Sequence, residues 1–225
     1  MKYTTILFAL TIPCHAAISI SLPGNSETAA WTGLNNTSYP STAGFPTHST
    51  STDLWPSAIS PDAGATLGGS LNKVSGGGYF ASSSLYDAGT PGTFRITDLA
   101  SVADLETVIF QADLGSPLGA DAILSYNEGS QALAADYTAT SAGNFLSGFG
   151  GPSEQTTNYA WQWDLSGVSA PITDFTVTWS TNPHGTIYQM NLDTGDTFTQ
   201  AVPEPTVSLL AALSLALTAL RRRRA

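Results

Sequence analysis

Alternation of large apolar and small polar residues is the feature that most constrains this fold. In residues 159–164 (YAWQWD) the rings fall at every second position, and in residues 175–180 (FTVTWS) large apolar residues alternate with Thr and Ser. A β-strand points successive side chains to opposite faces of a sheet, so each run predicts a strand with one buried face. The tryptophans of these two runs are therefore expected in the core: Trp161, Trp163 and Trp179.

Further strands are predicted along the same part of the chain, at residues 93–97, 107–112, 122–126 and 186–192. Ser- and Gly-rich turns separate these runs, and no segment between them has a sustained helical period. Strands that follow one another without alternating helices indicate an all-β fold. We expect one antiparallel β-sandwich of jelly-roll or lectin-like type over residues 17–200, with residues 25–78 laid over it as long loops.

Charge is scarce and unevenly placed. Only 11% of the 225 residues are charged, and the formal net charge is −10. Residues 17–202 hold all the acidic residues except Glu204 but only two basic ones, Lys73 and Arg95, which gives this region a net charge of −14. Such an acidic surface repels nucleic acid and anionic head groups, so a nucleic-acid partner is excluded.

The N-terminus has the pattern of an export signal. Lys2 precedes a short apolar run at residues 4–13, and small residues at positions −3 and −1, Cys14 and Ala16, predict cleavage between Ala16 and Ala17. A buried first strand is the alternative interpretation of this run. Cleavage would remove residues 1–16 and with them Cys14, the single cysteine. Disulfides and thiolate sites are then excluded, and burial of a core must hold the domain together.

The C-terminus combines three features in order. Pro203, Glu204 and Pro205 form an extended break, an apolar run follows at residues 207–220, and the chain then carries Arg221, Arg222, Arg223 and Arg224. A helix of fourteen residues is about 21 Å long, short of a hydrocarbon core of about 30 Å. The arginines would stay on the cytoplasmic side of a membrane, so the rest of the chain would face outward.

In this order, the three features resemble the PEP-CTERM sorting signal of exported bacterial proteins. The resemblance covers residues 202–225 only. It implies that Pro203, Glu204 and Pro205 are recognised by an exosortase, that the short hydrophobic helix 207–220 is a transient membrane anchor, and that the four arginines stop transfer. It also implies an association with exopolysaccharide. A core or amphipathic helix with a basic end is the alternative, although residues 207–220 show no polar face.

Catalytic patterns are lacking in the sequence. No nucleophile elbow or phosphate loop is present, and His48 and His184 are too few and too far apart to predict a zinc site. We interpret Asp104 and Glu106 as solvated charges in a loop. We therefore expect a protein that is not an enzyme. The alternative, a glycoside hydrolase acting on the matrix, would need two carboxylates that converge in space.

Two groups of residues suggest binding. Asn191, Asp193 and Asp196 surround a Gly with oxygen ligands that suit Ca²⁺, although a plain hairpin turn explains the same residues. Trp31 and Trp55 lie outside the alternating runs and are candidates for an exposed platform on which sugar rings stack.

These patterns together predict an exported protein of structural or adhesive type. It would be tethered to the membrane through its tail, then released by an exosortase to the cell surface or extracellular matrix. The alternative is a glycan-binding, lectin-like module assisted by Ca²⁺; otherwise no cofactor is expected.

Overall fold

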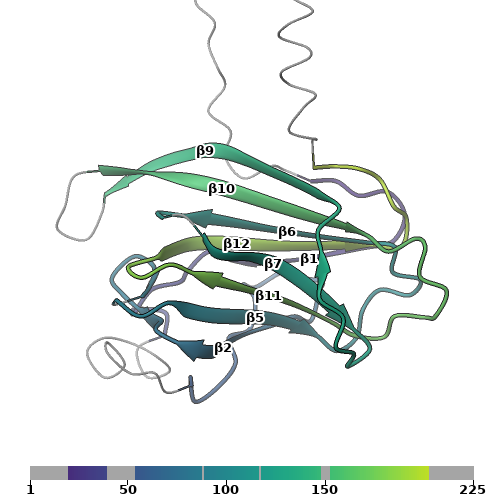
Figure 1. Cartoon of the computed structure of the whole chain (residues 1–225), viewed down its shortest axis with the longest axis horizontal. Coiled ribbons are helices and arrows are strands. Elements are labelled where there is room, and N and C mark those ends of the chain that lie inside the picture. The colour runs from purple at the N-terminus through teal and green to yellow at the C-terminus, as the bar shows by residue number, and fades with distance from the viewer. Residues whose placement is uncertain (1–19, 40–53, 88, 117, 148–152, 203–225) are drawn as a thin grey trace, which may run out of the picture.

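The computed structural model describes residues 20–39, 54–87, 89–116, 118–147 and 153–202. Within these ranges the protein is all-β, with two antiparallel sheets and no helix (Figure 1). The described residues accordingly include no helix long and apolar enough to cross a membrane. The predicted signal peptide, residues 1–16, and the predicted sorting tail after residue 202 with its helix 207–220 lie outside them.

The larger sheet has seven strands. Its order is β3-β4-β12-β6-β10-β9, and β1 also pairs with β12, beyond the short contact with β4. The bounds of its strands are β1 Ser26–Trp31, β3 Tyr79–Phe80, β4 Leu85–Tyr86, β6 Thr107–Leu114, β9 Tyr137–Ser147, β10 Ser153–Asp164 and β12 Thr186–Gly195.

The smaller sheet has five strands in the order β2-β5-β11-β7-β8. Their bounds are β2 Ser70–Gly76, β5 Gly92–Asp98, β7 Leu118–Tyr126, β8 Leu133–Ala134 and β11 Phe175–Thr181. Its central strand, β11, has a clean alternation of buried and half-buried residues, as the sequence predicts.

One hydrophobic core joins the two sheets. Phe110 of the larger sheet and Trp179 of the smaller one have ring centroids 4.7 Å apart. Trp161 stacks on Phe110 at 5.4 Å, and Phe94 lies 6.0 Å from Trp179. Trp161, Trp163 and Trp179 are all buried, which confirms the prediction from the alternation. Aromatic pairs of this kind add to the stabilisation that area burial provides.

The six predicted strands are confirmed as β5, β6, β7, β10, β11 and β12. The prediction that residues 25–78 form only loops is wrong, because β1 and β2 lie there. Their sequences, SETAAW and SLNKVSG, are rich in small and polar residues and carry little apolar alternation. Pairing with β12 and β5 stabilises these strands, and such tertiary context overrides weak local preference.

A buried carboxylate lies just beyond β4. Asp87 accepts hydrogen bonds from the Thr181 hydroxyl and from the Gly92 amide, 3.2 Å away. Gly92 leaves room for it, since a Cβ there would come within 2.7 Å of Asp87 Oδ1. Burial raises the pKa of Asp87 to about 6, although the two hydrogen bonds and the charge of Lys73 act in the opposite direction.

The raised pKa of Asp87 predicts how the stability of the fold depends on pH. An acid with a raised pKa binds its proton more tightly in the folded state, so the free energy of unfolding falls as pH rises from 3.8 to about 6. A shift of about two pKa units corresponds to about 3 kcal/mol. We expect Asp87→Asn to make this fall shallower in urea unfolding at pH 4, 5, 6 and 7. Asp121→Asn, at an exposed position, is the control; equal slopes in both variants would contradict the prediction.

Candidate functional site

The outer face of the larger sheet carries the candidate site. Every residue of β6 is buried, including those that point away from the core. The outward-pointing residues of β6 are Thr107, Ile109, Gln111 and Asp113. The second sheet covers only one face of β6, so other residues must cover these side chains.

The two ends of the described chain cover the apolar half of this face. Ile109, Ala160 and Val202 form a small second core. Partly buried residues pack against it from β9 and from both chain ends: Tyr137, Ala139, Ile20, Leu22 and Ala201. Figure 1 shows the purple start and the yellow end of the described chain near each other at the same side of the sheet. The start and the end of the fold therefore meet here.

Gln162 of β10 fixes the C-terminal segment. Its Oε1 accepts hydrogen bonds from the backbone amides of Ala201 and Val202, at 2.9 and 3.0 Å. Its Nε2 donates to the Thr199 carbonyl at 2.7 Å and to the Thr107 hydroxyl at 3.1 Å. Gln162 and Val202 are both 0% exposed. The chain is thus held against the sheet up to the residue that precedes Pro203.

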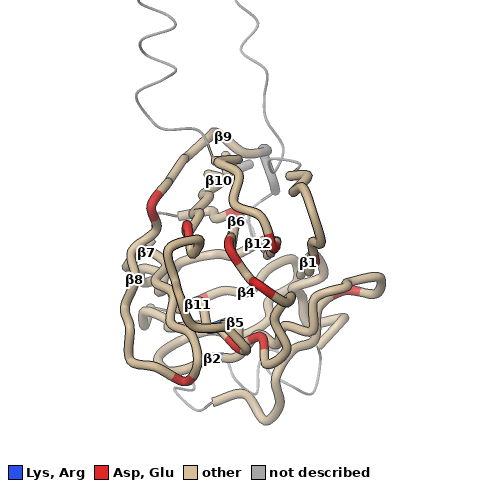
Figure 2. The backbone as a smooth tube through the Cα atoms, turned by 90° about the vertical axis from the view of Figure 1, so that its right-hand side faces the viewer, with Lys and Arg blue, Asp and Glu red and all other residues tan. Residues whose placement is uncertain are grey.

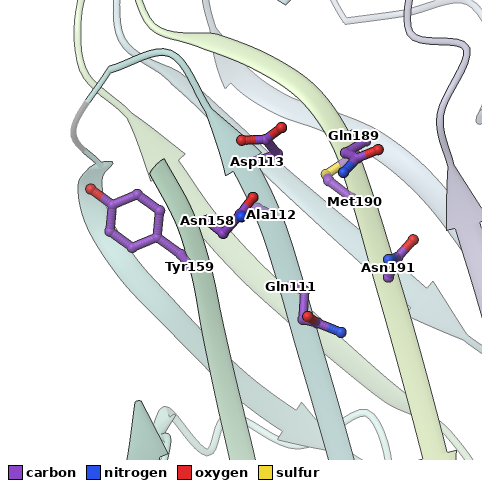
Figure 3. A pocket seen from close by; sticks show the side chains of 8 residues that line it. All are labelled: Gln111, Ala112, Asp113, Asn158, Tyr159, Gln189, Met190 and Asn191. Carbon is purple, nitrogen blue, oxygen red and sulfur yellow. The ribbon is translucent and has the colours of Figure 1, made fainter. Parts of the chain in front are cut away.

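The other half of the outer face is polar. Asn158 of β10 and Gln189 of β12 are both register partners of Asp113 of β6, and Asn191 is the partner of Gln111 one row away. Figure 3 shows these amide and carboxylate side chains on three neighbouring strands. They line a small cavity of about 10 Å³, the space of about one water molecule.

Two carboxylates on this face, the buried Asp113 and the half-buried Asp193, have pKa values raised by burial. Burial raises the pKa of Asp113, with partial compensation by the Thr156 hydroxyl, and Asp113 Oδ1 has no hydrogen-bond partner of normal geometry. Burial also raises the pKa of Asp193, while the side chains of Thr28 and Gln111 hydrogen-bond to it and lower it. Figure 2, which views the molecule from the opposite end of the sheets, shows acidic residues in several strands and loops there as well. The face therefore offers acceptors and amide donors under a negative potential.

The predicted platform of Trp31 and Trp55 is wrong. Trp31 is 0% exposed and Trp55 is 8% exposed. Their indole N–H groups donate to the carbonyls of Ile59 and Gly78, and Trp55 lies 5.1 Å from the Phe80 ring. Trp31 ends β1 on its buried side, so both indoles contribute to the core and neither offers a flat face to a sugar.

The structure does not assemble the predicted calcium ligands Asn191, Asp193 and Asp196. The segment is not a loop but the end of β12, where Asn191 and Asp193 lie on the outer face. Asp196 lies beyond the strand, and both of its carboxylate oxygens accept hydrogen bonds from Asn25. The Asn25 backbone amide donates to Oδ1 at 2.9 Å, and the Asn25 side-chain Nδ2 donates to Oδ2 at 2.6 Å. Among the described residues, no three His, Cys, Asp or Glu side chains group as a metal site.

The remaining predicted residues fall in two classes. His184 lies in an exposed turn, where its Nδ1 is 2.8 Å from the Tyr86 hydroxyl. The cleavage pair Ala16 and Ala17, His48, the motif Pro203, Glu204 and Pro205, and the arginines 221–224 are outside the described residues. Sequence reasoning missed Gln162 and the polar row around Asp113. The sequence does carry a signal for them. Gln162 lies between the two tryptophans of β10, and Gln111 and Asp113 interrupt the apolar run of β6.

No family model matches the chain, and no curated protein or solved structure is significantly similar to it. The chemistry of the outer face must therefore follow from its own residues. A row of carboxylate and amide groups on adjacent strands can both accept hydrogen bonds from hydroxyl groups and donate to them. This arrangement suits binding of a neutral, hydroxyl-rich molecule better than covalent catalysis.

The Gln162 contacts predict a local effect of mutation. We expect Gln162→Ala to speed hydrogen exchange at the amides of Ala201 and Val202, because both lose their acceptor. Gln162→Glu keeps the accepting oxygens and serves as the matched variant, with exchange at these two amides closer to that of the unmodified protein. Mass-spectrometric or NMR exchange data checks this; unchanged protection in Gln162→Ala would contradict it.

Proposed function

We propose that the chain is an exported structural or adhesive protein, sorted to the cell surface or extracellular matrix by its C-terminal signal. Residues 1–16 direct export and are removed. Residues 207–220 tether the precursor to the inner membrane, and an exosortase reads Pro203, Glu204 and Pro205 and releases the β domain. The Arg cluster stays on the cytoplasmic side.

The docking of residues 198–202 is the observation that carries this proposal. Gln162 and the Phe198–Glu106 hydrogen bond of 3.0 Å hold the segment against the sheet. Val202 is fully buried, and the Pro-Glu-Pro sequence begins at the next residue. Every strand of the described residues thus ends before the motif starts, which supports a tail that can be cut off without loss of any of these strands.

The position of the N-terminal end supports the same proposal. Ile20 and Leu22 pack against the cluster that contains Val202, so both ends of the fold lie on the same face. A precursor with an export signal at one end and an anchor at the other needs both to reach one membrane. Ends on one face of the domain satisfy that geometric requirement without a long linker.

Charge favours a neutral or cationic environment for the exported domain. Its net charge of −14 over residues 17–202 repels nucleic acid and anionic lipid. A neutral exopolysaccharide is compatible with this surface. We assign no enzymatic role, because the polar row around Asp113 offers hydrogen bonds rather than an activated nucleophile with its base.

The sorting step is tested by changing the motif. Replacing Pro203, Glu204 and Pro205 with alanine is expected to leave the protein in the inner-membrane fraction of a strain that has an exosortase, because the enzyme no longer recognises it. Thr206→Ala, next to the motif, is the control and is released normally. Cell fractionation with immunoblotting measures this. Unchanged release of the triple variant would refute the sorting role.

A second candidate function is glycan binding by a lectin-like or jelly-roll sandwich, favoured by the polar half of the outer face. Gln189 and Asn191 are half-exposed there, above the buried Gln111 and Asp113. Side-chain amides and a carboxylate in register on three strands match the donors and acceptors of adjacent sugar hydroxyls. The acidic surface makes a neutral glycan the preferred ligand.

A glycan array with the purified protein tests this candidate. The double variant Gln189→Ala, Asn191→Ala is expected to weaken binding of a neutral glycan about tenfold, since it removes two side-chain amides that hydrogen-bond the ligand. The matched control is Asn72→Ala, in β2 of the other sheet, where the side chain bonds only to Ser70. Absence of any glycan bound by the unmodified protein, or equal loss in the control, would reject the candidate.

A further inference from the structure

Three oxygen atoms without hydrogen-bond partners lie between the sheets near the start of β1. They are Glu27 Oε2, Asp98 Oδ2 and Thr194 Oγ1, and all three atoms are buried. Asp98 is 1% exposed and Thr194 is 0% exposed. Buried polar atoms are nearly always paired, so a group of unpaired ones calls for a missing partner.

Strand pairing brings two of these side chains together. Glu27 of β1 and Thr194 of β12 are direct partners in the antiparallel register, so their side chains share one face of the sheet. Ala29 and Leu192, two positions along each strand, belong to the core on that same face. Glu27 and Thr194 therefore both point toward the smaller sheet.

Asp98 faces them from the smaller sheet. It ends β5 on the side of Phe94 and Ile96, which belong to the shared core. The loop that precedes β2 lies close to both β1 and β5 here. The Leu67 amide donates to the Thr28 carbonyl at 3.1 Å, and a Cβ on the next residue, Gly68, would lie 3.9 Å from Asp98 Oδ1.

The local charge is negative and uncompensated. Burial, and then the charge of Asp98, raises the pKa of Glu27. Burial also raises the pKa of Asp98, and the charge of Asp174 raises it further. Hydrogen bonds from the backbone amides of Ala100 and Leu99 lower it in part. The charges of Glu27, which is half-buried, and Asp98, which is buried, thus repel each other, an arrangement that is costly unless a positive charge compensates it.

Neither basic residue of the described chain supplies that charge. Lys73 lies near Asp87 and donates to the Gly78 carbonyl at 3.4 Å. Arg95 is exposed, on the opposite face of β5 from Asp98. Neither basic side chain therefore compensates these two carboxylates, and a bound cation is one way to supply the missing charge.

We propose that Glu27, Asp98 and Thr194 form a binding site for a divalent cation, Ca²⁺, between the two sheets. All three ligands are hard oxygen donors, without the nitrogen or sulfur that zinc prefers. Ca²⁺ accepts irregular sets of six to eight oxygen ligands, whereas Mg²⁺ requires near-octahedral geometry. The cation would join β1 and β12 to β5 and so link the two sheets at this end.

Calcium titration of the purified full chain after treatment with EGTA tests the site. We expect one Ca²⁺ per chain by isothermal titration calorimetry and a higher melting temperature with Ca²⁺. Glu27→Gln and Asp98→Asn are each expected to weaken binding at least about tenfold, as loss of a charged oxygen ligand does. In EGTA, Glu27→Gln should melt at or above the temperature of the unmodified protein, because the variant removes the repulsion from Asp98.

Asp193→Asn is the matched control. Asp193 is also a partly buried carboxylate, but it belongs to β12 and points to the outer face of the larger sheet. The variant is expected to keep the full response to Ca²⁺. No binding by the unmodified protein, a response lost in Asp193→Asn but kept in Glu27→Gln, or equal stabilisation by Mg²⁺ would each overturn the proposal.

Discussion

Burial of β6 on both faces is the constraint on which the rest of the structure depends. A strand in an antiparallel sandwich-like fold usually has one face against the core and one toward water. In β6, Val108 and Phe110 point into the shared core, while Ile109 and Gln111 point out and are buried as well. The smaller sheet covers the first face. The second face needs its own cover, and the chain ends provide it over Ile109.

That cover connects the fold to the proposed function. Because Val202 and Ile20 are part of it, both ends of the described chain are held on this face of the larger sheet. Gln162 satisfies the last backbone amides that would otherwise be buried unpaired. The rest of the same face is polar around Asp113, where side chains of β6, β10 and β12 line a small cavity. The apolar half thus holds both ends of the described chain, and the polar half carries the groups on which the proposal of glycan binding rests.

Strong periodicity predicted the core strands, and long-range pairing explains what it missed. Trp179 sits in a run whose alternation is visible without a structure, so both its strand and its burial were predictable. Trp31 sits in SETAAW, where Ala and Glu occupy the buried face, so neither its strand nor its burial has a local signal. Residues 107–114 have no alternation because both faces are buried, and the sequence cannot say what covers each.

The sites were less predictable than the strands for the same reason. Asn191, Asp193 and Asp196 are close in sequence, yet strand geometry sends their side chains to different partners. Glu27, Asp98 and Thr194 are far apart in sequence and converge only because β1 pairs with β12 and β5 lies opposite. A ligand set built from three strands leaves no spacing that a sequence pattern can detect.

The central claim is that residues 17–202 are the finished domain and that the segments on either side are signals. Intact-mass spectrometry of the protein recovered from outside its own cells tests this most directly. The account predicts a mature chain that begins at Ala17 and lacks the four terminal arginines. Recovery of the complete 23.4 kDa chain, from Met1 to Ala225, would contradict it.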